Sequence, residues 1–510
     1  MKIDFKRELR RSKQRIEHRL RDREWSPQDQ PMFTARNIHY ELSSRDRGIT
    51  AGGIGAMQQM AQKLGLAKAI DDRLQLLKVH LPYSESDHVL NLAYNALAGG
   101  NCIEDLEHLR NSEGYLDSLG AQRIPDPTTA GDFCRRFTTA DIDTLQDVVN
   151  EIRVSVWQRQ PKEFFEQAII DADGTEVATD GEYKEGIGLS YKGTWGYNVL
   201  VISLANTNEP LFLANRGANH SSQEGAAARF DQAIALVRRA GFKSVMLRGD
   251  TDFSQTHHLD RWHAQGVHFV FGYDACPNLV EKAESLPEEA WKRLNRPARY
   301  EVKTEPRTPR DNVKAAIVEQ KEYLNFHLVK EDLAEFDYQP GACETAYSMI
   351  VLKKTISVER GQQLLYPEVR YFFFITNRRD MTTAEVVATA NDRCNQENLN
   401  AQLKGGVRAL RAPVDTLLSN WAYMVMTALA WSMKAWFALL LPTWGRWGKR
   451  YRDEQRELLR MEFRTFLNAM IRIPAQIVRS GRRIIFRLMA YNRWLPALLR
   501  GVEGLRALRC

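Results

Sequence analysis

FFEQAIIDAD at residues 164–173 and KSVMLRGD at residues 243–250 both predict a buried strand that leads into a turn. The first is rich in β-branched and aromatic residues, the second is a short apolar run, and each is followed by Gly or Thr. Ends of neighbouring strands open onto a crevice, where α/β proteins place their chemistry. We therefore expect Asp173 and Asp250 to face one crevice. An aspartate at a strand end is also an ordinary turn residue, so neither decides a function alone.

Strands and helices alternate on the C-terminal side of the first stretch. Gly196–Ala205, Pro210–Ala214 and Val267–Gly272 read as strands, and Ser222–Ala240 and Ser254–Gln265 read as helices. This order predicts an α/β domain with a mixed sheet.

Residues 274–380 interrupt the alternation. Strand-like runs at Ala315–Glu319, Tyr347–Lys353 and Arg370–Thr376 lie among polar turns, which predicts a β-rich insertion. From Thr382 onward the pattern predicts helices to the end of the chain.

A third candidate group lies on a helix expected to contain Arg393, Glu397 and Lys404. At about 100° per residue, Glu397 lies roughly 40° and Lys404 roughly 20° from Arg393, so all three project from one face. Two cations beside one carboxylate keep it ionised as a metal ligand and provide partners for phosphate oxygens. The alternative is an ordinary ion pair between Arg393 and Glu397 on a solvated face.

The net charge of +7 is unevenly distributed. Residues 1–30 hold ten Lys and Arg against six Asp and Glu, and residues 401–510 hold twenty against six, which leaves the remainder at −11. Two basic ends around an acidic centre suit a polyanion held by the ends while carboxylates act between them. Solvated Arg-rich helices are the alternative. The C-terminal cations expected to contact DNA phosphates, from either a helix or a strand, are Arg479, Arg482, Arg483 and Arg487.

Composition excludes several other classes of protein. A chain of 510 residues, 44% of them hydrophobic, can form several domains with large cores. Its six cysteines include no C-x-x-C pair, so no zinc ribbon is expected. The first thirty residues lack the apolar core of a secretory signal, which predicts a cytoplasmic protein. Thr416–Met433 is interrupted by polar residues and is expected to be a buried helix, not a membrane span.

The carboxylates and the motifs around them resemble a known family. The sequence is similar to DDE transposases of the bacterial insertion sequences related to IS4 and, more closely, of the IS1380 family. The last of its matching motifs resembles the family signature Tyr-x2-Arg-x3-Glu-x6-Lys, with Ala390 in place of the tyrosine, so the contact of that ring is not transferred. The matching motifs are Tyr83-x-Glu85-Ser-Asp-His-Val-Leu, Gly99-Gly100, Glu104-Asp105, Pro125-Asp-Pro-Thr-Thr-Ala-Gly-Asp-Phe133, Asp171-Ala-Asp173-Gly-Thr175, Arg248-Gly-Asp250-x-Asp252-Phe253, Thr376-Asn377 and Arg393-x3-Glu397-x6-Lys404.

The resemblance implies an RNase H-like catalytic domain with a mixed sheet and a β-rich insertion between the second and third acidic residues. It also implies that Asp173, Asp250 and Glu397 are the catalytic, metal-binding triad, with Asp171 as the alternative to Asp173. Arg393 and Lys404 would then touch DNA near the cleaved end. Two Mg²⁺ ions, with Mn²⁺ as a substitute, suit such oxygen ligands.

On this interpretation the chain divides into six parts. The expected boundaries are 1–36 for a basic N-terminal segment and linker, 37–160 for a helical DNA-binding domain, 161–273 for the first part of the RNase H-like core, 274–380 for the β-rich insertion, 381–440 for the core helix with the catalytic Glu, and 441–510 for a basic helical C-terminal region.

The predicted function is DNA transposition. The protein would bind the terminal inverted repeats of its insertion sequence and target DNA, and cleave and join strands with Mg²⁺ as a synaptic homodimer at the bacterial nucleoid. One alternative is a catalytically silent DNA-binding relative that represses transposition, although all three acidic residues are present. Another is a carboxylate-pair glycosidase, which would need neither Arg393 nor Lys404 beside its acid.

Overall fold

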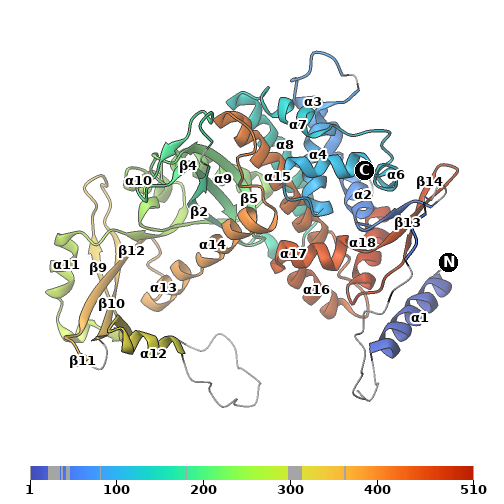
Figure 1. The fold of residues 1–510 in the computed structure, drawn as a ribbon. Helices are drawn as coiled ribbons and strands as arrows, with labels where there is room; N and C mark the ends of the chain where they lie inside the picture. Colours follow the sequence, from blue (N-terminus) through green and yellow to red (C-terminus); the bar gives the residue numbers. More distant parts are fainter. Residues whose placement is uncertain are drawn as a thin grey trace.

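The computed structural model describes residues 2–20, 35, 38–41, 46–80, 82–179, 181–296, 313–360 and 363–508. Within these residues the main sheet has eleven strands, flanked by helices from both ends of the chain (Figure 1). The predicted linker at 26–36 lies almost wholly outside the described residues.

The core of this sheet has the RNase H-like arrangement. Its strand order is β5-β4-β2-β6-β7: β4 is antiparallel to both β2 and β5, whereas β2, β6 and β7 are parallel to one another. The prediction of a mixed sheet is confirmed. The core elements are β2 (Gln167–Ala178), β3 (Gly188–Leu189), β4 (Trp195–Leu204), β5 (Glu209–Gly217), α9 (Ala226–Ala240), β6 (Ser244–Gly249), η3 (Thr251–Phe253), α10 (Thr256–Ala264) and β7 (Val267–Tyr273).

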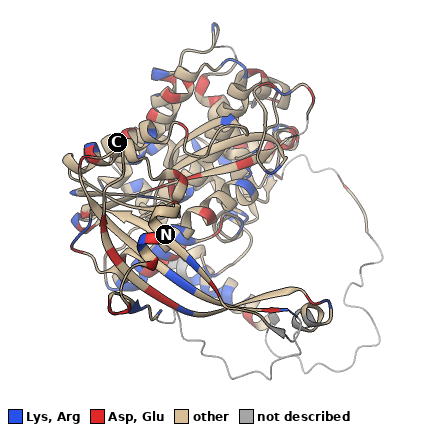
Figure 2. Ribbon diagram, turned by 90° about the vertical axis from the view of Figure 1, so that its left-hand side faces the viewer, with Lys and Arg blue, Asp and Glu red and all other residues tan. Residues whose placement is uncertain are grey.

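The β-rich insertion continues the core sheet. Strand β12 pairs antiparallel with β7, and β10 and β9 follow outward from it. Both acidic and basic residues occur along these long strands (Figure 2). The predicted strand Ala315–Glu319 is wrong, because these residues lie in helix α12. The elements are α11 (Pro277–Glu284), η4 (Glu288–Ala290), β8 (Lys292–Arg293), α12 (Val313–Gln320), β9 (Leu324–Tyr338), β10 (Tyr347–Arg360), β11 (Gln363–Leu364) and β12 (Glu368–Thr376).

The N-terminal region is helical, as the sequence predicts. Several of its helices begin at the cap residues that start helices in general: Ser84 and Thr138 form capping boxes, and Asp126 accepts a hydrogen bond from the Thr129 amide. The elements are α1 (Lys2–Leu20), β1 (Gly48–Ile49), α2 (Ile54–Lys63), α3 (Leu66–Arg73), α4 (Glu85–Ala98), η1 (Ile103–Asp105), α5 (Leu106–Arg110), α6 (Glu113–Leu119), α7 (Pro127–Cys134), α8 (Thr139–Trp157) and η2 (Lys162–Phe165).

The C-terminal region is mostly helical but includes a hairpin. The general prediction of helices to the end of the chain does not hold at residues 475–488. Of the helix and the strand left open for the arginine-rich segment, the strand is correct: β13 and β14 form a hairpin, and β13 pairs with β1 from the opposite end of the chain. Ala475 and Ile477 are buried in this small sheet and alternate with the half-buried Gln476 and Val478, which is the period of a strand. The elements are α13 (Thr383–Asn391), α14 (Cys394–Ala401), π-helical turn η5 (Gln402–Gly406), α15 (Leu417–Leu439), α16 (Gly448–Arg460), α17 (Phe463–Phe466), η6 (Leu467–Ile471), β13 (Ala475–Ser480), β14 (Arg483–Leu488) and α18 (Leu495–Ala507).

Helix α15 occupies the centre of the molecule. It begins at a capping box formed by Thr416 and Ser419, and it packs against α4, α8 and β5 (Figure 1). Its side chains from Ser419 to Leu439 are buried, which confirms the predicted buried helix over Thr416–Met433. None of the helices in the described ranges has the length and apolar character needed to span a membrane.

Candidate active site

Strand register brings Asp173 and Asp250 to the same level of the sheet. Asp171 on β2 pairs with Arg248 on the parallel strand β6, so Asp173 and Asp250 each lie two residues further along. Asp250 follows the last residue of β6, as predicted, but β2 continues to Ala178 and Asp173 is not at a strand end. Gly174 leaves room for the loop that packs there, because a Cβ at this position would lie 2.9 Å from the Ser222 Cβ.

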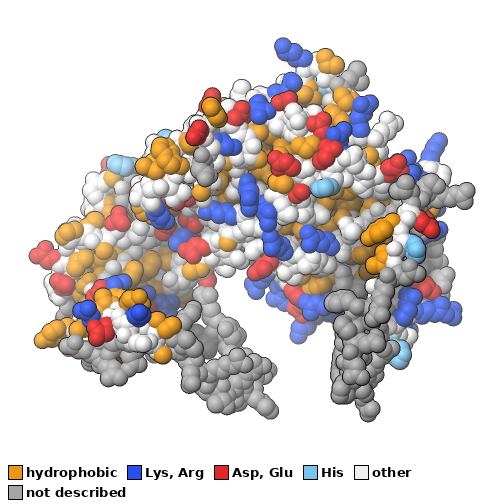
Figure 3. Space-filling model, in the orientation of Figure 1, with side chains coloured by type: hydrophobic (Ala, Val, Ile, Leu, Met, Phe, Trp, Pro, Cys, Tyr) orange, Lys and Arg blue, Asp and Glu red, His pale blue; other side chains and the backbone are white. Residues whose placement is uncertain are grey.

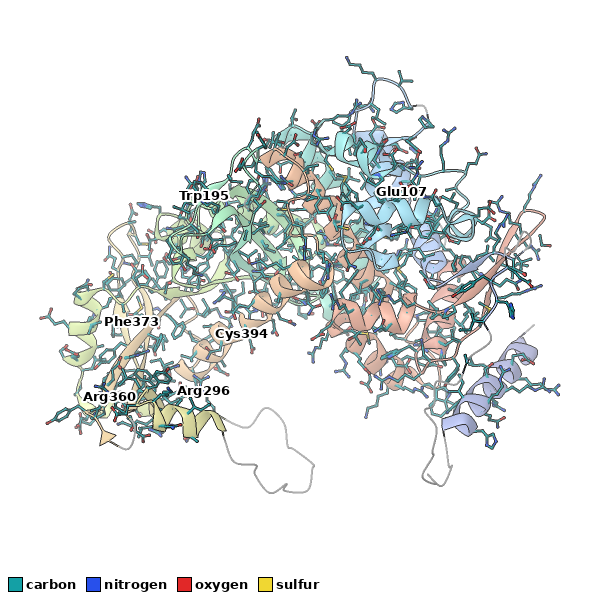
Figure 4. The ribbon with its side chains drawn as sticks, viewed as in Figure 1. Glu107, Trp195, Arg296, Arg360, Phe373 and Cys394 are labelled. Atoms are coloured by element: carbon teal, nitrogen blue, oxygen red, sulfur yellow. The ribbon has the colours of Figure 1, made fainter. Side chains whose placement is uncertain are left out.

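Glu397 joins these two aspartates from helix α14, whose first residue, Cys394, is labelled in Figure 4. The Arg393 guanidinium lies between the three carboxylates. Its Nη1 is 3.8 Å from Asp173 Oδ1 and 3.9 Å from Asp250 Oδ2, and its Nη2 is 3.4 Å from Glu397 Oε1. Three acidic side chains from distant parts of the sequence thus converge on one cation.

The predicted single helix through Arg393, Glu397 and Lys404 is interrupted at both ends. Helix α13 ends at Asn391, Arg393 precedes the first residue of α14, and Lys404 lies in the π-helical turn η5. Although the π-helical turn is wider than an α-helical turn, Lys404 still lies near the carboxylates of the site. Burial lowers the pKa of the Lys404 ammonium, and attraction from Glu176 and Asp173 opposes that change.

Burial dominates the electrostatics of the two aspartates. It raises the pKa of Asp173 to about 6, while Arg393 lowers that pKa and the charges of Asp250 and Glu397 raise it further. Burial also raises the pKa of Asp250, against the opposing effect of Arg393. A nearby cation stabilises the ionised form of a carboxylate in such buried surroundings. Glu397 is more open to solvent, with 60% of its side chain exposed.

Asp171, the alternative to Asp173, has both carboxylate oxygens engaged. It is 1% exposed, and Arg248 donates to it from Nε and Nη2, each at 2.7 Å. The Nη1 of Arg248 donates to the Thr389 carbonyl oxygen on α13 at 3.1 Å. Asp171 therefore fixes α13 to the sheet, and Asp173 is the carboxylate that faces Arg393.

The donor chemistry of the site fits divalent metal ions. Mg²⁺ and Mn²⁺ take carboxylate oxygens, and three such groups already converge on the Arg393 cation. Across the described ranges, however, no group of three acidic, His or Cys side chains is spaced as a ready-made metal site. Arg393 lies where a shared cation would lie, so Asp173, Asp250 and Glu397 would hold a metal ion only after its guanidinium moves.

Comparison with known proteins gives the family. The model of the family described as "Transposase DDE domain group 1" matches residues 41–510. The chain belongs to this transposase family. Among solved structures, the piggyBac transposase synaptic complex with hairpin DNA matches with a TM-score of 0.35 and 8% sequence identity, over 83% of this chain and 82% of that chain. No curated protein matches the sequence.

The four C-terminal arginines of this transposase are not at the carboxylates. They lie on the β13–β14 hairpin, at the opposite side of the molecule from α13 (Figure 1). Arg479 is paired with Asp117 at 2.8 Å, and Arg487 donates to Gln476 Oε1 at 3.3 Å. Arg482 and Arg483 are exposed at and beside the hairpin turn. The structure thus separates the basic hairpin from the acidic centre.

Asn400 is a residue of the site that was not predicted from the sequence. Its Nδ2 donates a hydrogen bond of 3.0 Å to Asp173 Oδ2. The available signal was the spacing Glu397-x2-Asn400, which places an amide about one helical turn beyond the glutamate. A neutral polar residue in a helix has no distinguishing pattern until its partner is known.

Proposed function

We propose that this chain is the transposase of an insertion sequence of the IS1380 type, which binds the terminal inverted repeats of its element and cleaves and joins DNA strands. The observation that supports this most is the convergence of Asp173, Asp250 and Glu397 on Arg393. Together with the family match over residues 41–510, it favours nuclease chemistry at this site.

In this proposal the three carboxylates hold two Mg²⁺ ions. When bound, such ions activate a water or 3′-hydroxyl nucleophile and stabilise the leaving oxygen of a phosphodiester. Asp173 and Asp250 provide ligands held rigidly by the sheet, and Glu397 closes the set from α14. Mn²⁺ would substitute, because it accepts the same oxygen ligands.

The cations around the carboxylates would hold the DNA. In this proposal Arg393 and Lys404 contact phosphates near the cleaved end. Lys and Arg side chains gather on the face shown in Figure 3, beside a hollow between the insertion and the C-terminal helices. The β13–β14 hairpin would hold duplex DNA at a distance from the three carboxylates. The two ends of the element each need an active site, so we propose a homodimer in the synaptic complex. We also propose the six domain boundaries given above.

The test is cleavage of a terminal-repeat duplex taken from the flanks of the gene. Wild-type protein should nick it with Mg²⁺ and not with EDTA. Asp173→Asn, Asp250→Asn and Glu397→Gln should each lose at least 100-fold in cleavage rate while still binding the duplex, because phosphate contacts remain. Strong repeat binding without cleavage by the wild type would favour a repressor, the competing function.

A further inference from the structure

Two buried amides lie on the face of α14 that packs on the sheet. Gln396 and Asn400 are four residues apart, so they project from one side of the helix, and they are 1% and 5% exposed. Both lie above β2 and β4, on the side of the sheet where Asp173 faces the helix.

The hydrogen bonds of the two amides differ. Gln396 is fully paired: its Nε2 donates to the Val201 carbonyl oxygen at 3.1 Å, and its Oε1 accepts from the Ser203 hydroxyl. Asn400 donates from Nδ2 to Asp173, but its buried Oδ1 accepts from no residue in the described part of the chain. A buried acceptor without a donor is destabilising. Gln396 therefore anchors the helix, whereas Asn400 has an oxygen with free capacity.

Three other buried asparagines have a similar oxygen, but their amide groups donate to the backbone. Asn95, Asn198 and Asn215 also have an Oδ1 without a donor within the described ranges, but their Nδ2 groups donate to backbone carbonyl oxygens. Of these four amides, Asn400 is the one that touches a carboxylate of the candidate triad.

We infer that Asn400 is a fourth member of the metal site, in which Nδ2 orients Asp173 and the free Oδ1 is a neutral oxygen ligand for the divalent cation. This inference rests on the proposed function. Asn side chains are ordinary ligands of hard cations, and a neutral ligand adds an oxygen without adding charge to an already acidic site. Asn400 also joins Asp173 on β2 to the helix of Glu397, so it sets the separation of two carboxylates that must share an ion.

The experiment is a Mn²⁺ titration of the full chain without DNA at pH 8, with free Mn²⁺ followed by electron paramagnetic resonance. The variants are Asn400→Leu, which loses both amide atoms, and Asn400→Asp, which keeps an oxygen at the Oδ1 position. Gln396→Leu is the matched control, because it removes a buried amide from the same helix face without touching a carboxylate. Asp173→Asn reports on the metal site itself, and thermal unfolding of each variant monitors folding.

Asn400→Leu should bind Mn²⁺ at least tenfold more weakly than the wild type, Asn400→Asp at least as tightly, and Gln396→Leu unchanged despite a lower melting temperature. Wild-type affinity in Asn400→Leu, or equal weakening in Asn400→Asp, would overturn the inference while leaving the triad intact. If Asp173→Asn also binds like the wild type, the metal site of the proposed function fails with it. Should Asn400→Leu not fold, the comparison of Asn400→Asp with the wild type decides alone.

Discussion

Arg393 is the cation that faces all three candidate carboxylates, and its single charge offsets part of theirs. Its guanidinium is within 3.9 Å of Asp173, Asp250 and Glu397, so a divalent cation and this side chain compete for the same space. DNA phosphates offer the guanidinium another partner. Metal binding and DNA binding would thus favour each other through the movement of one side chain.

Arg393→Gln should therefore bind Mn²⁺ about tenfold more tightly than the wild type when DNA is absent, since the competing cation is gone. Calorimetric titration at pH 8 measures this, where Asp173 is ionised in both proteins. Lys404→Gln is the comparison: among the described residues Lys404 makes no ion pair with the three carboxylates and only a longer-range attraction to Asp173, so its removal should raise the affinity less. Weaker Mn²⁺ binding by Arg393→Gln would show that the guanidinium assembles the site and does not compete for it.

Asp173 should make stability depend on pH. Its pKa is about 6 in the folded chain, mainly because of burial, and 3.8 is the ordinary value that applies to the unfolded chain. Between these values the folded state keeps a proton that the unfolded state releases, so stability falls as pH rises from about 4 to 6 and stays reduced above. In EDTA, Asp173→Asn should thus raise the free energy of unfolding at pH 8 by about 1–3 kcal/mol and by little at pH 4. An equal effect at both pH values would mean that charge is not the cause.

Among the helices and strands, the correct predictions are those that depend on the local sequence pattern alone. β2 and β6 were recognised because apolar runs end in polar residues, and α15 because its apolar side chains occur on all faces. The short run Ala315–Glu319 was misassigned, because four or five apolar residues suit a strand or a helix equally. Strand β9 was missed although Leu324, Phe326 and Leu328 alternate with polar residues, and these apolar side chains are exposed in the structure.

Tertiary contacts account for the rest of what the sequence left open. Asp171 and Asp173 face the same side of one strand, and the following Gly174-Thr175 favoured Asp173. The structure adds the position of Arg248 on the neighbouring strand, which pairs with Asp171. The role of Asn400 depends on Asp173, which is 227 residues away. The hairpin at 475–488 forms against β1, a strand from the opposite end of the chain.

The β13–β14 hairpin is the element on which to test nonspecific DNA contact. Changing Arg482 and Arg483 together to Ala should weaken binding of repeat and random duplexes by similar factors, because phosphate contacts carry little sequence information. The slope of log affinity against log salt should fall by about one for each lost contact. Fluorescence anisotropy over a salt series measures both, with Arg479→Ala as a comparison because Arg479 is already paired with Asp117. Loss confined to the repeat duplex would show instead that these arginines read bases.

At the scale of the whole molecule, one interior holds the parts of the transposase together. Helix α15 lies between the N-terminal helices and β5, so the region expected to bind DNA and the catalytic sheet share a core. That core also contains buried charge. Arg153 pairs with Glu209 at 3.0 Å, and both are at most 1% exposed. Because the sheet also continues into the insertion through β7 and β12, unfolding of any one part should disturb the others.

Lys434 is another ionisable side chain buried in this core. It is fully buried on α15, where its Nζ donates to the Leu459 carbonyl oxygen at 2.9 Å and lies 3.9 Å from the centre of the Trp431 ring. Burial lowers its pKa to about 7, against an ordinary value of 10.5 and despite the opposing charge of Glu209. From pH 7 to about 10 the unfolded chain holds a proton that the folded chain lacks, so stability should rise with pH over this window.

Lys434→Met keeps the volume of the side chain and replaces the titratable amine with an apolar group. The variant should be more stable than the wild type by about 1–3 kcal/mol at pH 7, since apolar replacement of buried charge is often stabilising, and the gain should shrink toward zero near pH 10. Urea unfolding at several pH values measures both effects, with Lys63→Met as a control, because that partly buried lysine also donates to a single carbonyl oxygen, that of Leu508. A loss of stability at pH 7 would mean that the bond to Leu459 and the contact with Trp431 outweigh the burial of the amine. The core would then owe part of its stability to Lys434.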